Sequence, residues 1–141
     1  MQITQLDPLT YIGPQISLED MAEMNHMGVR TIVVARPEGE ESGQPEIADI
    51  RAAAGVYGIG VHQIPVTPGN VSDANVGAFH AAMSNTTGLI FVYCRSGMRA
   101  TTLWALDAAT QGRPVGDILQ AARKASFDLT GLIPRLTERA A

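Results

Sequence analysis

The only cysteine of the chain, Cys94, lies where an enzyme would place a nucleophile. It follows the apolar run 89–92 and Tyr93, and precedes the polar segment Arg95-Ser96-Gly97-Met98-Arg99. That order predicts a strand, a tight loop and a helix, with the cysteine in the loop. Backbone N–H groups at a helix N-terminus and two nearby arginines favour the thiolate, which is the nucleophilic form of cysteine. The segment 94–99 therefore predicts a cysteine nucleophile in an anion-binding loop.

A buried structural cysteine is the alternative, because free cysteine often packs as a small apolar side chain. The polar residues that follow Cys94 are poor core material, which favours a functional thiol with a solvent-reachable sulfur. Gly97 suits a positive φ or a close backbone approach to a ligand. Ser96 can donate to a bound anion or satisfy the backbone of its own turn.

Length and composition predict one domain over residues 1–141. The chain has 141 residues, 45% of them hydrophobic and 17% charged, and a net charge of -4. This size supports a single core, and the absence of a basic excess argues against nucleic acid or an anionic membrane as partner. The first residues do not show a basic region followed by an apolar one, which is the pattern of a secretion signal. A cytoplasmic location is therefore expected. One cysteine and three scattered histidines predict no disulfide, no metal site and no cofactor.

Predicted strands and helices alternate along the chain. Strands are expected at 11–12, 31–35, 61–66 and 89–93, and helices at 17–28, 45–57, 72–83, 99–110, 115–122 and 129–139. Pro65 places the strand 61–66 at a sheet edge or at its exit, because proline cannot donate to the ladder. The alternation is typical of an α/β fold with a mostly parallel sheet of four to five strands flanked by helices.

The motifs Val33-Val34-Ala35-Arg36-Pro37, Ile64-Pro65-Val66 and the segment 92–99 resemble the cysteine phosphatase superfamily, whose signature is an apolar strand, Cys-x5-Arg and a helix. More closely, nearly the whole chain resembles a small bacterial phosphatase-like domain that occurs alone or fused to beta-lactamase-like hydrolases. The resemblance implies a three-layer sandwich and a catalytic cysteine.

The loop departs from that signature in its length. Only four residues separate Cys94 from Arg99, which resembles the six-residue active loop of single-domain rhodaneses. Because the N–H groups of the loop line the volume in front of the sulfur, a shorter loop encloses a smaller object. A persulfide sulfur fits this loop better than a phosphoryl group.

Two further departures concern groups that a phosphatase uses. Relatives place an aspartate general acid just after the Ile-Pro-x strand, where this chain has Thr67-Pro68-Gly69. The nearest carboxylate, Asp73, is a candidate general acid if the protein is a phosphatase, or a residue that interacts with the dipole of its helix. The hydroxyl residue that the superfamily carries after the signature arginine is replaced by Ala100.

The preferred hypothesis is a sulfurtransferase that moves sulfane sulfur from thiosulfate or a small persulfide to a thiol through a Cys94 persulfide. The catalytic pair would be Cys94 and Arg99, with the backbone of Ser96, Gly97 and Met98 binding the anion. The alternative role for Arg99 is to pin the loop to a carbonyl or carboxylate.

Two more arginines are candidates for recruiting the donor. Arg95 is expected to point outward, and Arg36 leaves a central strand on the ligand-binding side. The ordinary alternative for Arg36 is a salt bridge to Glu38, Glu40 or Glu41.

Two other functions remain open at this point. One is a phosphatase that acts through a phosphocysteine, and the other is a non-catalytic thiol sensor or persulfide carrier. The expected partners are a small anionic sulfur donor and a thiol acceptor, and a partner enzyme of sulfide oxidation is a further hypothesis.

Overall fold

Five strands form one sheet in the order β1-β2-β5-β3-β4 in a computed structural model of the chain, which describes residues 2–141. They are β1 (Thr4–Asp7), β2 (Thr10–Gly13), β3 (Val29–Val34), β4 (Gly60–Gln63) and β5 (Leu89–Tyr93). Only the β1–β2 pair is antiparallel, and β5 lies between β2 and β3. The predicted α/β class and mostly parallel sheet are confirmed.

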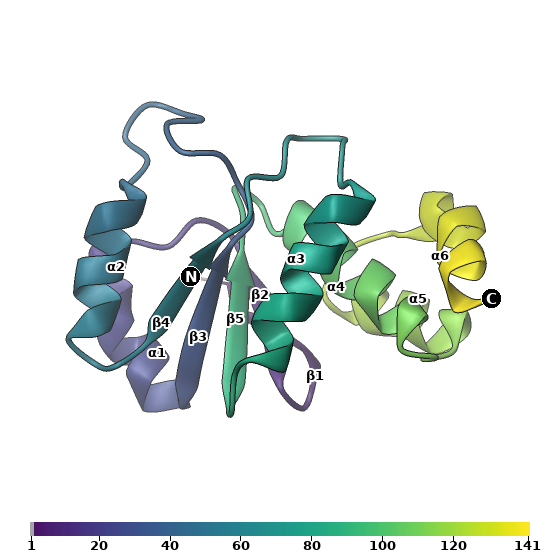
Figure 1. Cartoon of the computed structure of the whole chain (residues 1–141), viewed down its shortest axis with the longest axis horizontal. Coiled ribbons are helices and arrows are strands. Elements are labelled where there is room, and N and C mark those ends of the chain that lie inside the picture. The colour runs from purple at the N-terminus through teal and green to yellow at the C-terminus, as the bar shows by residue number, and fades with distance from the viewer. Residues whose placement is uncertain (1) are drawn as a thin grey trace.

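Helices cover both faces of the sheet and make three layers (Figure 1). The 3-10 turn η1 (Leu18–Asp20), α1 (Met21–Met27) and α2 (Ile47–Gly55) lie on one side. The other side carries α3 (Asp73–Ser84), α4 (Met98–Thr110), α5 (Val115–Lys124), the 3-10 turn η2 (Thr130–Leu132) and α6 (Ile133–Ala140). This is the three-layer arrangement that the family resemblance implied.

The alternation of side chains along β3 and β5 divides the core in two. Ile32 and Phe91 belong to the cluster that includes α1 and α2, whereas Val33 and Val92 belong to the cluster that includes α3 and α4. Because successive strand residues point to opposite faces, Cys94 continues the phase of Val92 and joins the α4 cluster.

Local signals explain two of the helix ends. Gly28 ends α1 with φ +92°, as its sequence position predicts. At the start of α3, the Ser72 hydroxyl accepts from the N–H of Asn75, and the Asn75 side chain accepts from the N–H of Ser72.

The structure differs from the predicted strands at several strand ends and in one additional strand. The strand predicted at 61–66 ends at Gln63, two residues before Pro65, because proline has no N–H for the ladder. The short edge strand β1 was not predicted, because four residues with little apolar character give a weak pattern.

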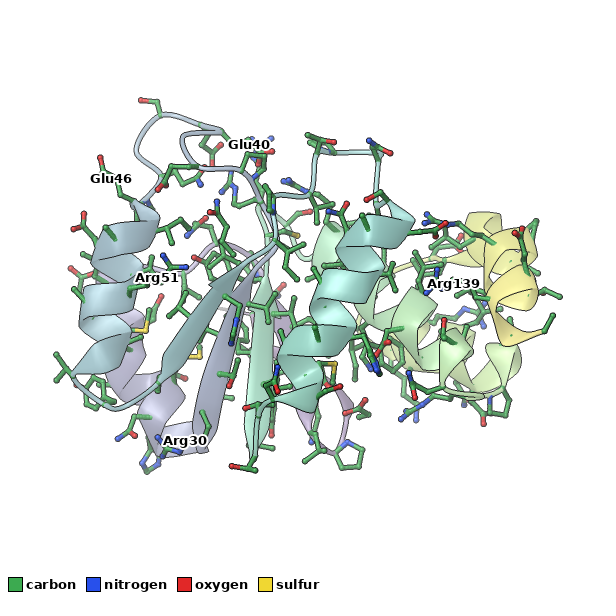
Figure 2. All side chains as sticks on the ribbon, in the orientation of Figure 1. Arg30, Glu40, Glu46, Arg51 and Arg139 are labelled. Atoms are coloured by element: carbon green, nitrogen blue, oxygen red, sulfur yellow. The ribbon has the colours of Figure 1, made fainter. Side chains whose placement is uncertain are left out.

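The carboxyl ends of the four parallel strands lie at one end of the sheet, which brings the loops after β2, β3, β4 and β5 together. The loops after β3 and β4 are at the top of Figure 1, and ligands bind at this edge in open α/β sheets. Figure 2 places Glu40 at this end and Arg30 at the opposite one. Across residues 2–141, no helix is both long and apolar enough to cross a membrane.

Candidate active site

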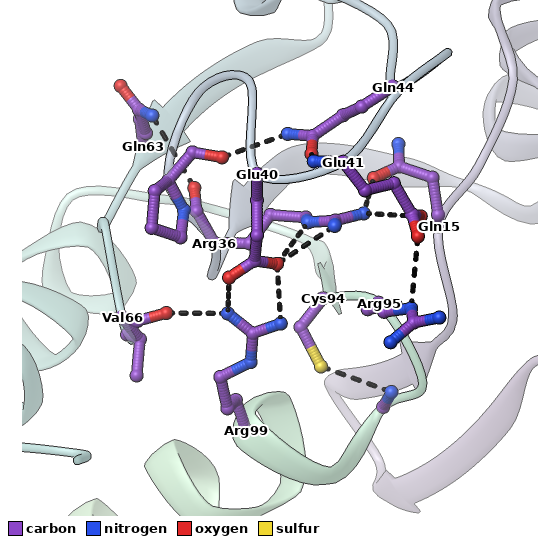
Figure 3. Close-up of polar contacts among 12 residues, drawn as sticks. Gln15, Arg36, Glu40, Glu41, Gln44, Gln63, Val66, Cys94, Arg95 and Arg99 are labelled. Atoms are coloured by element: carbon purple, nitrogen blue, oxygen red, sulfur yellow. Dashed lines mark hydrogen bonds and ion pairs between the residues drawn. The ribbon is translucent and has the colours of Figure 1, made fainter. Parts of the chain in front are cut away.

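The loop between β5 and α4 holds the sulfur of Cys94 close to a backbone donor. The Gly97 N–H donates to Cys94 Sγ at 3.1 Å (Figure 3). Gly97 has φ +101°, and α4 begins at the next residue, Met98. The N–H and the hydroxyl of Thr101 both donate to the Gly97 carbonyl oxygen, at 3.0 and 2.8 Å. The first turn of α4 therefore fixes the loop that turns its amide toward the sulfur.

Position 97 requires glycine for two reasons. Its positive φ is one that residues with side chains rarely adopt, and a Cβ there would lie 2.9 Å from Cζ of Phe127. The predicted positive φ of Gly97 is confirmed.

Cys94 is less accessible than the sequence suggested. The residue is 1% exposed, so the expectation of a solvent-reachable sulfur is wrong for this conformation. The strand phase directs its side chain toward α4. The residues that flank its loop, Arg95 and Arg99, bind Glu41 and Glu40 of the loop after β3 (Figure 3).

Arg99 is held by three hydrogen bonds. Its Nη1 donates to Glu40 Oε2 at 2.9 Å and to the Val66 carbonyl oxygen at 2.6 Å, and its Nη2 donates to Glu40 Oε1 at 2.8 Å. The side chain is 9% exposed. Arg99 therefore ties the start of α4 to the loops after β3 and β4, which is the structural alternative considered for it.

Arg36 is completely buried at the end of β3 and binds the same carboxylate. Its Nε donates to Glu40 Oε1 at 2.9 Å, and its Nη1 donates to Gln15 Oε1 at 2.8 Å. Its Nη2 lies 2.8 Å from Glu40 Oε1, but no acceptor among the described residues is aligned for a hydrogen bond to it. The salt bridge to Glu40 is the ordinary alternative that the sequence allowed.

Arg95 points outward, as expected, with 68% of its side chain exposed. Its Nε lies 3.1 Å from Glu41 Oε2, and its carbonyl oxygen accepts from the N–H of Gln15. Glu41 also lies 3.6 Å from Arg36. Two consecutive glutamates of one loop thus contact all three arginines near Cys94.

The charge balance of this cluster is close to neutral. Arg36, Arg95 and Arg99 bring three positive charges, and Glu40 and Glu41 bring two negative ones. The hydrogen bond from Arg99 is the main cause that lowers the pKa of Glu40 below 4.5, and a hydrogen bond from Arg36 adds to it. Glu40 is therefore ionised at neutral pH and neutralises cations that a substrate anion would otherwise meet.

Asp73, the candidate general acid, is paired with two other arginines. Its Oδ1 lies 3.1 Å from Arg135 Nη2 and 2.9 Å from Arg139 Nη1. The hydrogen bond from Arg135 is the main cause that lowers the pKa of Asp73. These contacts favour the ionised form, whereas a general acid must carry a proton.

Two hollows flank the active loop. One, of about 310 Å³, is lined by Ser96 together with Gly13, Pro14 and Phe127. The other, of about 210 Å³, is lined by Met98 and Arg99 together with Val71, Leu132 and Arg135. Ser96 and Met98 are thus exposed on either side of buried Gly97.

The sequence did not reveal the joint role of Glu40. It was considered only as a partner of Arg36, four residues earlier, and nothing in its spacing relates it to Arg99, 59 residues away. Gln15 and the Val66 carbonyl oxygen were missed for the same reason. Among residues 2–141, no group of three or more histidine, cysteine, aspartate or glutamate side chains is placed to hold a metal.

Comparison with known families gives a match over most of the chain. Residues 3–111 match the family described as "Beta-lactamase hydrolase-like protein, phosphatase-like domain". A beta-lactamase hydrolase-like protein of Agrobacterium fabrum is 33% identical over 130 residues, which make up 92% of this chain and 30% of that protein. The chain therefore spans about a third of the length of this curated relative.

Solved structures give matches over nearly the full length. A Neisseria meningitidis protein described as a "putative phosphatase" is 32% identical, with a TM-score of 0.86 and 99% of both chains covered. The kinase associated phosphatase, with its catalytic-site cysteine replaced by serine, is 15% identical, with a TM-score of 0.73, 92% of this chain covered and 84% of that one. The latter similarity concerns the fold alone.

Proposed function

Because the chain belongs to the phosphatase-like domain family of beta-lactamase hydrolase-like proteins, we propose that it is a cysteine-dependent enzyme, and that the group Cys94 transfers is a sulfane sulfur. The observation that carries this proposal is the position of Glu40. Its carboxylate binds Arg36 and Arg99, the last residue of the segment 94–99, and a phosphoryl group bound at Cys94 would need these cations free.

The size of the loop supports the same choice. Four residues between Cys94 and Arg99 leave fewer N–H groups around the sulfur than the five of the phosphatase signature. Only the Gly97 N–H donates to Sγ within the described structure. A single additional sulfur atom makes smaller demands on this loop than three phosphoryl oxygens do.

The reaction proceeds in two thiol–disulfide-like exchanges. The Cys94 thiolate attacks the outer sulfur of the donor, a Cys94 S–S bond forms, and the bond between the two donor sulfurs breaks with its electron pair leaving on the inner sulfur. With thiosulfate the product that leaves is sulfite, and with a persulfide it is a thiolate. An acceptor thiolate then attacks the outer sulfur of the Cys94 persulfide and regenerates the Cys94 thiolate.

Neither exchange needs a general acid, because sulfite and thiolates leave as stable anions. Alkyl phosphates need one, and the candidate Asp73 is held ionised by Arg135 and Arg139. The hydroxyl of Thr101, one position beyond Ala100, is bound to the Gly97 carbonyl oxygen. The side chains around Cys94 thus meet the needs of sulfur transfer more fully than those of phosphate ester hydrolysis.

A phosphatase acting through a phosphocysteine is the second candidate, and the comparisons favour it. The matched family is described as phosphatase-like, and the Neisseria meningitidis protein is described as a "putative phosphatase". Neither description mentions sulfur transfer. The two candidates share Cys94 as nucleophile and differ in the group transferred.

One set of assays separates the candidates. Purified protein and its Cys94→Ser variant are compared for thiocyanate release from cyanide with thiosulfate or a small persulfide, for hydrolysis of an aryl phosphate, and for intact mass after incubation with each donor. We expect Cys94-dependent thiocyanate release and a mass increase of one sulfur atom. Cys94-dependent phosphate release without sulfur transfer would establish the phosphatase instead, and a one-sulfur adduct without turnover would establish a persulfide carrier.

A further inference from the structure

The carboxylate of Glu40 lies between two arginines. One of its oxygens, Oε1, lies 2.8 Å from both Arg99 Nη2 and Arg36 Nη2, and the other accepts from Arg99 Nη1 at 2.9 Å. Its own side chain is 18% exposed, whereas Arg36 is fully buried. An arginine with no exposed surface requires a nearby negative charge, and Glu40 supplies it.

The geometry around Arg36 is incomplete for a purely structural salt bridge. Arg36 Nη2 is buried, and no described acceptor is aligned for a hydrogen bond to it although Glu40 lies close. A buried unsatisfied donor costs free energy and is rare in folded proteins. This donor faces the same carboxylate as Arg99, so an anion bound at this cluster would satisfy it.

The charge balance near Cys94 limits what the site can hold. The three arginines, the two glutamates and the Cys94 thiolate that the reaction uses together carry no net charge. Each negative charge that a substrate brings is therefore uncompensated, and a phosphate monoester brings between about one and a half and two of them at neutral pH. A donor with one negative charge adds less uncompensated charge than a dianion does.

We propose that Glu40 is the specificity-determining residue of this site, and that it selects a monoanionic organic persulfide over dianions such as thiosulfate or a phosphate monoester. This inference rests on the proposed sulfur transfer for its substrate, and on the Glu40 contacts for its mechanism. In the reaction, Cys94 S⁻ attacks the outer sulfur of R–S–S⁻, and the electron pair of the broken S–S bond leaves on R–S⁻. The outer sulfur keeps its charge on Cys94, so atoms and charge balance without an added oxidant or reductant.

The test compares two anions of similar shape in a protein that cannot react. Sulfate is a tetrahedral dianion, and methanesulfonate replaces one of its charged oxygens with a methyl group. Their dissociation constants are measured by calorimetry for Cys94→Ser alone and for Cys94→Ser combined with Glu40→Gln or with Glu23→Gln. Glu23→Gln is the matched control, because it removes the same charge from an exposed side chain of α1 that is not part of the arginine–glutamate cluster.

We expect Glu40→Gln to improve sulfate binding at least tenfold relative to methanesulfonate, and Glu23→Gln to change that ratio less than threefold. An unchanged ratio in the Glu40 variant, an equal change in both variants, or no binding of either anion to any variant would overturn the proposal. Far-UV circular dichroism and a melting curve establish that each variant is folded at the assay temperature.

A second measurement does not depend on the Glu40 variant. The parent Cys94→Ser protein should bind methanesulfonate more tightly than sulfate at low ionic strength, and tighter sulfate binding would contradict the proposal even if Glu40→Gln failed to fold. Neither measurement involves catalysis. If both anion-binding results were obtained but the protein formed no persulfide, the role of Glu40 in anion selection would stand and the proposed sulfur transfer would be wrong.

Discussion

Arg99 and Glu40 are joined by two parallel hydrogen bonds, from Nη1 to Oε2 at 2.9 Å and from Nη2 to Oε1 at 2.8 Å, across 59 residues of sequence. This paired geometry is the strongest arrangement available to an arginine and a carboxylate. It connects the helix that follows Cys94 to the loop that follows β3. The conformation of the nucleophile loop therefore depends on a residue from another crossover of the fold.

Arg99→Lys should lower the rate of Cys94 persulfide formation by about 10²-fold, because a lysine cannot donate to both Glu40 oxygens in the geometry of a guanidinium. The measurement is the rate of the one-sulfur mass increase with a small persulfide as donor. Arg123→Lys, an exposed position in the last turn of α5, is the control and should retain the parent rate. Equal rates in both variants would show that the paired geometry is not required.

Glu40→Ala should destabilise the fold by about 2–3 kcal/mol, because it leaves the buried charge of Arg36 without its main partner. The measurement is the free energy of unfolding in urea at neutral pH. Glu41→Ala is the matched control, and we expect it to cost less than about 1 kcal/mol because its contacts are more exposed. Similar losses in the two variants would mean that burial of Arg36 does not depend on Glu40.

The sequence predicted the nucleophile loop because all of its signals are local. An apolar strand, a glycine with positive φ and a helix start lie within ten residues of Cys94, and the structure has each of them. The alternation of apolar residues likewise predicted β3 and β5. Local signals could not predict the pairing of Glu40 with Arg99, because it depends on which loops the parallel strands bring to one edge of the sheet.

The burial of Cys94 has a similar explanation. The polar residues after it indicated exposure, but its own direction follows from the phase of β5, which places it with Val92. Its surroundings depend on the loop after β3, whose course no periodic pattern predicts. Local sequence signals thus predicted the conformation of the loop that carries Cys94 and missed the burial of its side chain.

The unfolding free energy should fall as the pH is lowered through the titration of Glu40. Arginine hydrogen bonds lower the pKa of this carboxyl from 4.5, so the stability it contributes is fully present above that value. This stability is lost as the pH falls below 4.5 toward the folded-state value. Urea unfolding at a series of pH values between neutrality and pH 3 should show a shallower decline for Glu40→Gln than for the parent. If the unfolding free energies of the two proteins declined equally with pH, the loss of stability could not be assigned to Glu40.

Gly97→Ala should destabilise the protein by about 1–3 kcal/mol and slow persulfide formation, because a side chain there combines positive φ with a clash against Phe127. Gly116→Ala is the matched control, since that glycine lies in α5 with open space around its Cβ position. It should be neutral or stabilising, because alanine favours helices. Urea unfolding of both variants provides the comparison, and a neutral Gly97→Ala would show that the loop can adopt another conformation.

Asp73→Asn tests whether the Asp73 carboxyl group is a general acid for phosphate ester hydrolysis or only a partner of two arginines. If Asp73 only pairs with Arg135 and Arg139, its replacement should change Cys94-dependent sulfur transfer, and any aryl or alkyl phosphate hydrolysis, by less than about threefold. If Asp73 is a general acid, hydrolysis of an alkyl phosphate should fall by about 10²–10⁴-fold, while an aryl phosphate with a good leaving group should be much less affected. The measurement is the steady-state rate on both esters. Asp128→Asn, which removes another carboxyl group at a position distant in the sequence, is the control. Because the arginine hydrogen bonds keep Asp73 ionised, we expect the first result.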